Sequence, residues 1–166
     1  LESDPDQAEH HLRVAISLDE TREPPYLLLA DLLLKKQANK QAKLVLDLGI
    51  KKLPQSRALR HKLGELYLSF AYHHRATKSP DLAERSATRA LEQNADLVEA
   101  RVLRAELREG AGADLGRDNE TRARMWENAK DDFEEARRAI ERRRTVIAAE
   151  PFSEADRATA LTALEK

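Results

Sequence analysis

The stretch that decides the fold is residues 23–56, which read EPPYLLLADLLLKKQANKQAKLVLDLGIKKLPQS. The pair Pro24-Pro25 favours a helix start, because proline has no amide hydrogen to lose in the first turn. Leucine and alanine recur at helical spacing over 26–36, and a second apolar run ends at the next proline. A polar break at Asn39, a residue that can cap a helix, separates the runs. The stretch therefore predicts two short antiparallel helices.

The same signals divide the rest of the chain into helices. Proline or a capping side chain marks several starts, and three glycines over 110–120 mark a loop. We expect helices from Pro5, over 57–73, from Ser79-Pro80, from Asp96 to Gly110, over 122–149 and from Ser153. The connections between them are mostly short, so neighbouring helices should be antiparallel.

A spaced triplet of small or apolar residues recurs on every second helix. Its members are four and three residues apart, which places them on one helix face. The triplets are Ala8, Leu12 and Ala15; Ala42, Leu46 and Gly49; Ala83, Ala87 and Ala90; and Ala129, Phe133 and Ala136. Successive triplets begin 34, 41 and 46 residues apart. The residues in excess of 34 fall in loops expected at 73–78 and 110–120, so the spacing predicts a two-helix repeat.

These units resemble the tetratricopeptide repeat family. Besides the triplets, the residues that carry the resemblance are Tyr26, Leu29, Ala30, Leu33, Pro54, Leu63, Gly64 and Tyr67. In the Leu-Gly-x-x-Tyr pattern of the last three, a small residue lets two helices touch and the aromatic ring fills the space beside it. The sequence departs from the family at Arg104 and Arg108, where the family prefers leucine and an aromatic residue.

The resemblance implies an all-α fold, a right-handed α-solenoid of antiparallel helix hairpins that ends in a long helix and a short capping helix. Its units are expected as follows: 1–20, the second helix of an incomplete repeat; 23–56, a full repeat; 57–97, a repeat with a loop insertion; 98–149, a degenerate repeat with a Gly-containing loop insertion and an extended second helix; and 152–166, the capping helix.

The resemblance also implies a concave groove lined by the first helix of each unit. The groove positions are Leu27, Asp31 and Leu34; His61, Glu65 and Leu68; and Val102, Glu106 and Glu109. Asp31, Glu65 and Glu106 form a line of carboxylates, and the Lys, Arg and Asn pattern with which some family members clamp a C-terminal carboxylate is absent. We therefore expect a partner segment with apolar and basic residues. The alternative is that these acids only solvate a helix face.

Composition argues against most other classes of function. The 29 basic and 30 acidic residues nearly cancel, so no overall charge indicates nucleic acid or an anionic membrane as partner. The absence of cysteine excludes thiolate zinc sites and cysteine nucleophiles. No spacing indicates a cofactor, a metal site or a catalytic set, so we expect no enzyme activity. The chain begins with Leu1, and we expect a fragment of a longer, bacterial protein whose location the sequence leaves unknown.

Two alternatives to groove binding remain open. The leucines of 27–34 surround their helix on nearly all sides and need cover from a ligand, an upstream helix or a second copy of the chain. Self-association is therefore one alternative, and the oligomeric state stays open. The other is binding of nucleic acid or an acidic partner by the cluster Arg137, Arg138, Arg142, Arg143 and Arg144, although glutamates interleave with these arginines.

Overall fold

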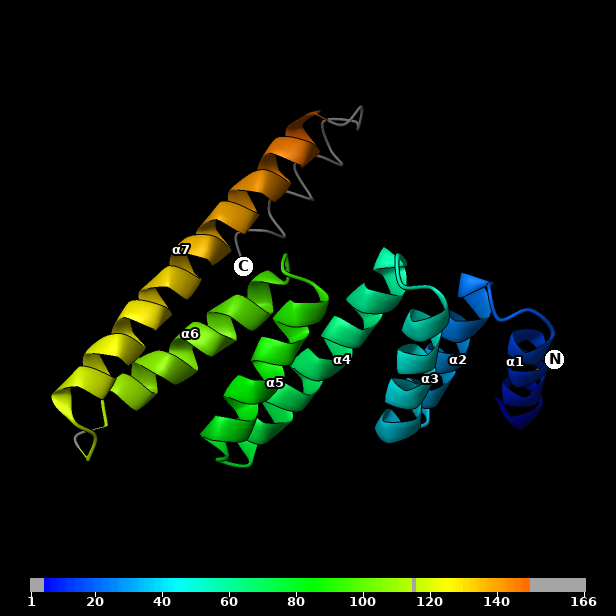
Figure 1. Cartoon of the computed structure of the whole chain (residues 1–166), viewed down its shortest axis with the longest axis horizontal. Helices are drawn as coiled ribbons and strands as arrows, with labels where there is room; N and C mark the ends of the chain where they lie inside the picture. The colour runs from blue at the N-terminus through cyan, green and yellow to red at the C-terminus, as the bar shows by residue number, and fades with distance from the viewer. Residues whose placement is uncertain (1–4, 115, 150–166) are drawn as a thin grey trace.

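The computed structural model describes residues 5–114 and 116–149, and these residues form seven α-helices. The helices are α1 (Pro5–Leu18), α2 (Glu23–Lys35), α3 (Asn39–Lys52), α4 (Arg57–Ala76), α5 (Pro80–Gln93), α6 (Val98–Gly112) and α7 (Asn119–Ala149). They follow one another side by side from α1 at one end of the molecule to α7 at the other (Figure 1). The all-helical stack of hairpins is thus confirmed, while the expected capping helix at 152–166 lies outside the described residues.

Three hairpins make up most of the stack. Within them, α2 packs against α3, α4 against α5 and α6 against α7. The second helix of each hairpin also packs against the first helix of the next, through α3 with α4 and α5 with α6. Helix α1 packs against α2, as the second helix of a preceding hairpin would. Each helix therefore packs against its neighbours along the chain, although α1 has no fully buried residue.

The main core lies where α2, α3 and α4 meet. Tyr26, Leu33, Leu46 and Leu59 are completely buried there. Gly49 allows α3 to approach closely, because a β-carbon at this position would lie 3.0 Å from Leu59 Cδ1. The leucine-rich helix α2 thus obtains most of its cover from its own neighbours.

Side-chain caps begin two of the helices. At the start of α4, the hydroxyl of Ser56 accepts a 3.1 Å hydrogen bond from the Leu59 amide and donates to Glu23 of α2. At the start of α7, Asp118 accepts a 2.8 Å bond from the Thr121 amide, and this bond lowers the pKa of the Asp118 carboxyl. This cap explains why α7 begins three residues earlier than expected.

Three residues expected to cap helices, Asn39, Ser79 and Asp96, do not do so. Ser79 stands directly before α5 but makes no side-chain cap hydrogen bond. The cap positions of α3 and α6 are occupied instead by Ala38 and Leu97, and neither of these side chains makes a cap hydrogen bond. Asn39 is instead the first residue of α3. Asp96 pairs with Arg142 of α7 at 3.3 Å. A carboxylate close to a helix start can therefore be recruited by a neighbouring helix.

The two expected loop insertions are partly helical, contrary to expectation. Helix α4 continues through Ala76, so residues placed in the loop at 73–78 lengthen this helix instead. Helix α6 continues through Gly112, and only 113–118 connect it to α7. Gly112 stays helical beside the Trp126 ring, and a β-carbon there would lie 2.5 Å from Trp126 Cδ1. A glycine that reads as a loop signal is here a point of close packing.

The turns after α2 and α4 each place a residue other than glycine in the left-handed region, Gln37 at φ 60° and Lys78 at φ 55°. Glycine is preferred at this position after a helix, because a β-carbon is strained there. We expect Lys78→Gly to raise the free energy of unfolding by about 0.5–1 kcal/mol. Urea denaturation followed by circular dichroism measures this, with Lys78→Ala as the control that should bring no gain.

Candidate protein-binding groove

The nine groove positions lie on α2, α4 and α6, the first helices of the three hairpins. Helices α2 and α4 contact each other directly. Arg75 of α4 lies 2.7 Å from Glu106 of α6, and this ion pair joins α6 to α4. The structure therefore brings the expected positions onto the first helices of three consecutive hairpins, and polar contacts link these helices.

Two of the three carboxylates share one lysine. Lys62 Nζ lies 3.0 Å from Asp31 Oδ1 and 3.4 Å from Glu65 Oε2, so a single cation bridges α2 and α4. The hydrogen bond from Lys62 to Asp31 raises the pKa of the lysine, because it stabilises the charged ammonium group. The line of acids is thus interrupted by a cation that the expected pattern did not include.

His61 also belongs to this polar set. Its Nδ1 lies 2.7 Å from Asn94 Nδ2, and its Nε2 lies 3.3 Å from Glu65 Oε1. With the asparagine amide donating to Nδ1, the remaining ring N–H faces the glutamate. His61 is therefore oriented by groups on both sides, and it holds the Glu65 carboxylate in place together with Lys62.

The apolar groove positions are partly covered by the protein itself. Leu27 and Leu34 pack against the main core, and Leu68 packs against buried residues of α4 to α6. Val102 packs against Ala136 and Ala139 of α7. These four side chains are half-buried, so only the outer part of each is accessible, while Glu109 is exposed.

The positions expected in the repeat core differ in burial. Those that are buried are Tyr26, Leu29, Ala30, Leu33, Ala42, Leu46, Gly49, Leu63, Gly64, Ala83, Ala87, Ala90, Ala129 and Ala136, while Ala8, Leu12, Ala15 and Tyr67 are half-buried and Pro54 is exposed. Phe133 is 39% exposed, contrary to expectation. The buried stripe of α7 passes through Ala129, Asp132, Ala136 and Ala139, so Phe133 stands beside this stripe and not on it.

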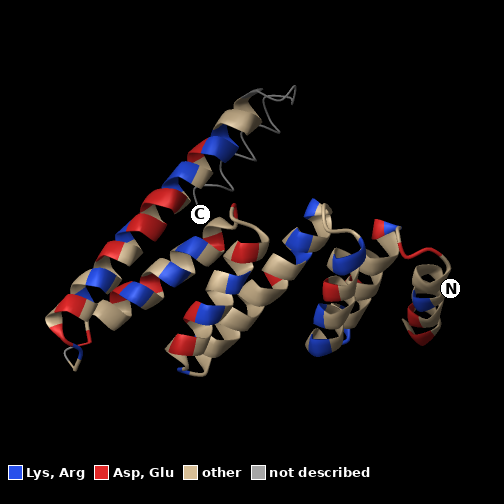
Figure 2. Cartoon of the chain, in the orientation of Figure 1, with Lys and Arg blue, Asp and Glu red and all other residues tan. Residues whose placement is uncertain are grey.

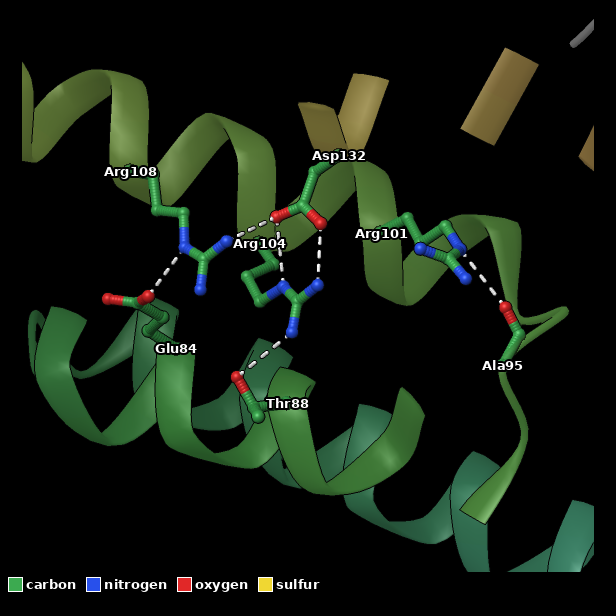
Figure 3. A network of polar contacts seen from close by, with 7 residues as sticks. All are labelled: Glu84, Thr88, Ala95, Arg101, Arg104, Arg108 and Asp132. Atoms are coloured by element: carbon green, nitrogen blue, oxygen red, sulfur yellow. Dashed lines mark hydrogen bonds and ion pairs between the residues drawn. The ribbon is translucent and has the colours of Figure 1, made fainter. Parts of the chain in front are cut away.

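Asp132 is the centre of a buried ionic network (Figure 3). Arg104 of α6 binds its carboxylate with two nitrogens, at 2.9 and 2.5 Å. Arg108, one turn further along α6, contacts the same carboxylate at 2.9 Å and Glu84 of α5 at 2.7 Å. Arg104 also lies 3.4 Å from the hydroxyl of Thr88. The network joins α5, α6 and α7 where a standard repeat would bury apolar side chains.

Sequence reasoning noted one half of this network and missed the other. Arg104 and Arg108 stand out in the sequence as departures from the family pattern, but Asp132 was not singled out as their partner. The signal that identifies Asp132 is its position, three residues after Ala129 and four before Ala136, on the small-residue face that must meet α6. A carboxylate on that face requires a cationic partner.

The other candidate sites make ordinary structural contacts. Among the described residues no group of three His, Cys, Asp or Glu side chains could hold a metal ion. In the arginine cluster, Arg138 pairs with Glu134 and Glu135, and Arg142 pairs with Asp96. These pairs favour a structural role over nucleic-acid binding.

Within residues 5–114 and 116–149, no helix is both long and apolar enough to span a membrane.

Comparisons with known proteins found one matching family model and similar solved structures. Residues 1–66 match the family model of the tetratricopeptide repeat. Among solved structures, the crystal structure of MamA is similar with a TM-score of 0.52 and 17% sequence identity. The similarity covers 83% of this chain and 70% of the MamA chain, and it concerns the fold. A search of the curated proteins found no significant sequence match.

Proposed function

Because residues 1–66 match the family model of the tetratricopeptide repeat, we propose that the protein is a non-catalytic scaffold that holds a segment of another protein. The proposed binding surface is the groove on α2, α4 and α6. Stacked hairpins leave the first helices without a covering layer, so their polar side chains remain accessible to a partner. The scaffold would serve the assembly of a larger complex.

The observation that carries this proposal is the accessible, net-negative set around Lys62. The side chains of Asp31 and Glu65 are 45% and 46% exposed, whereas Lys62 between them is 28% exposed. Two carboxylates that share one lysine leave a net charge of −1, and Glu109 adds an exposed carboxylate. A basic side chain of a partner can approach these oxygens, with an apolar neighbour against Leu27 or Leu34.

Reversing charges in the groove tests the proposal. The probe is a synthetic peptide with blocked ends and the central sequence Lys-Leu-Lys, titrated into isotope-labelled protein while amide NMR resonances are followed. We expect resonances of α2 and α4 around Asp31 and Glu65 to shift. Asp31→Lys combined with Glu65→Lys should reduce the affinity about tenfold or more, because each reversal turns attraction into repulsion.

The matched control is Glu92→Lys, an exposed position on α5 outside the groove. This variant should bind the peptide as the unmodified protein does. Unchanged affinity in a folded double variant, or an equal loss in Glu92→Lys, means that the groove is not the binding surface.

Self-association is a second candidate, favoured by leucines at the N-terminal hairpin. Leu28 of α2 is 57% exposed, and Leu44 of α3 is 66% exposed. Apolar surface of this kind can be covered by a second copy of the chain. Sedimentation over a wide concentration range distinguishes the candidates, since a chain that stays monomeric at high concentration rules out assembly through these leucines.

A further inference from the structure

A pocket of about 590 Å³ opens between the turn that joins α2 to α3 and the C-terminal half of α4. Gln37, Asn39 and Lys40 line it on the turn side, and Phe70 and His73 line it on the α4 side. Its volume lies within the roughly 300–1,000 Å³ of ligand-binding clefts. Helix α4 has 20 residues whereas α2 has 13, so the last turns of α4 extend along the turn and form one wall.

Both walls of this pocket belong to stretches without a carboxylate. Residues 32–46 contain four lysines and neither aspartate nor glutamate, and residues 66–80 contain one arginine and one lysine, again without an acid. The lower ends of α2 and α3, where their turn lies, are accordingly rich in basic residues (Figure 2). The pocket therefore lies in a locally positive region of a chain whose overall charge is close to zero.

The lysine that lines the pocket, Lys40, is available to a ligand. Lys36 is held by Asp6 and Glu9, and Lys43 by Asp47. Lys40 is exposed, and within the described part of the chain no ion pair engages it. Its ammonium group can therefore bind an incoming anion without giving up an internal partner.

The remaining lining suits a peptide. Gln37 and Asn39 carry amide groups that can donate to and accept from an extended backbone. Phe70 is half-buried and offers the outer part of its ring as an apolar contact. Ala38, at the cap of α3, supplies no side-chain acceptor to the backbone amides of the first turn that adjoins the pocket.

We propose that this pocket binds a segment of a partner protein in which an acidic residue stands next to an apolar one. The carboxylate pairs with Lys40, and the apolar side chain lies against Phe70. This surface is separate from the groove on α2, α4 and α6, whose net charge has the opposite sign, and the inference stands whether or not the groove binds a partner.

A titration with defined peptides tests the inference. Peptides with blocked ends and the central sequences Glu-Leu-Glu, Gln-Leu-Gln and Lys-Leu-Lys are added separately to isotope-labelled protein. We expect only Glu-Leu-Glu to shift the amide resonances of Asn39, Lys40 and Phe70, and added salt should weaken the binding. Lys40→Glu should reduce the affinity about 3- to 10-fold, and Lys40→Met should reduce it less.

The matched control is Lys51→Glu, the same reversal at an exposed site near the other end of α3. It should leave the affinity for Glu-Leu-Glu nearly unchanged. Lys40→Glu places an acid in the first turn of α3, where the helix dipole favours it, so loss of folding does not explain a loss of binding. The inference is overturned if Glu-Leu-Glu leaves the pocket resonances unmoved, if Lys-Leu-Lys shifts them equally, or if Lys40→Glu binds as well as the unmodified protein.

Discussion

Replacing Asp132 by Asn is expected to lower the free energy of unfolding by about 3 kcal/mol or more. The substitution preserves the shape of the side chain but removes the charge that Arg104 and Arg108 both contact. Their side chains are only 15% and 20% exposed, so water replaces the lost carboxylate poorly. Urea denaturation measures the loss, and hydrogen exchange should show α6 and α7 opening first.

The neighbouring residue provides the control for this prediction. Asp131→Asn removes the same charge from an exposed position on the same helix and should change stability by no more than about 0.5 kcal/mol. Equal effects at Asp131 and Asp132 would contradict a structural role for the network.

Apolar replacement of the whole network has a different expected result. Arg104→Leu, Arg108→Leu and Asp132→Leu together leave no buried charge among the three positions, and such exchanges are often neutral or stabilising by about 1–4 kcal/mol. A triple variant that is less stable than Asp132→Asn alone would show that the geometry of the hairpin depends on the ion pairs themselves.

Leu59→Ala is expected to destabilise the protein by about 2–5 kcal/mol, through lost burial and the cavity left behind. Leu59 is completely buried where α2, α3 and α4 meet, so the cavity adjoins all three helices. Thermal and urea denaturation measure the loss. The control is Ala58→Gly, at the exposed neighbouring position, which should cost only the roughly 1 kcal/mol of helix propensity.

A second substitution makes this prediction specific to the observed packing. A β-carbon on Gly49 would lie 3.0 Å from Leu59 Cδ1 and 3.1 Å from the Tyr26 ring. Gly49→Ala should therefore be less harmful in the Leu59→Ala background than in the unmodified protein, by about 0.5 kcal/mol or more. Strict additivity of the two substitutions would mean that α3 and α4 do not meet as described.

The helices of the N-terminal part could be predicted closely, because their signals are local. Pro24-Pro25 lies in the first turn of α2 and Pro80 begins α5, since proline suits a first helical turn in any surroundings. The ends of α4 and α6 could not be predicted in the same way. Whether 73–76 and 110–112 remain helical depends on what packs beside them, and Gly112 meets Trp126, which is 14 residues away in the sequence.

The repeat spacing predicts which residues line the proposed groove, but it does not predict their ionic partners. Asp31, Glu65 and Glu106 were recognised as a line of acids, whereas Lys62 and Arg75 were not recognised as their partners. Lys62 faces Asp31 only because α2 and α4 lie side by side, and no local pattern reports which side chain of one helix reaches the next.

The sequence by itself determined that the chain folds as a stack of helical hairpins, because hydrophobic period, prolines and small residues act over a few residues. Only the tertiary structure decided where charge is neutralised. It pairs Lys62 with Asp31 and Glu65 and buries Asp132 between two arginines. Lys40, in contrast, is exposed and lines a pocket. The physical reason is that helix formation depends on neighbours in sequence, whereas the partner of a charge depends on which helices lie side by side.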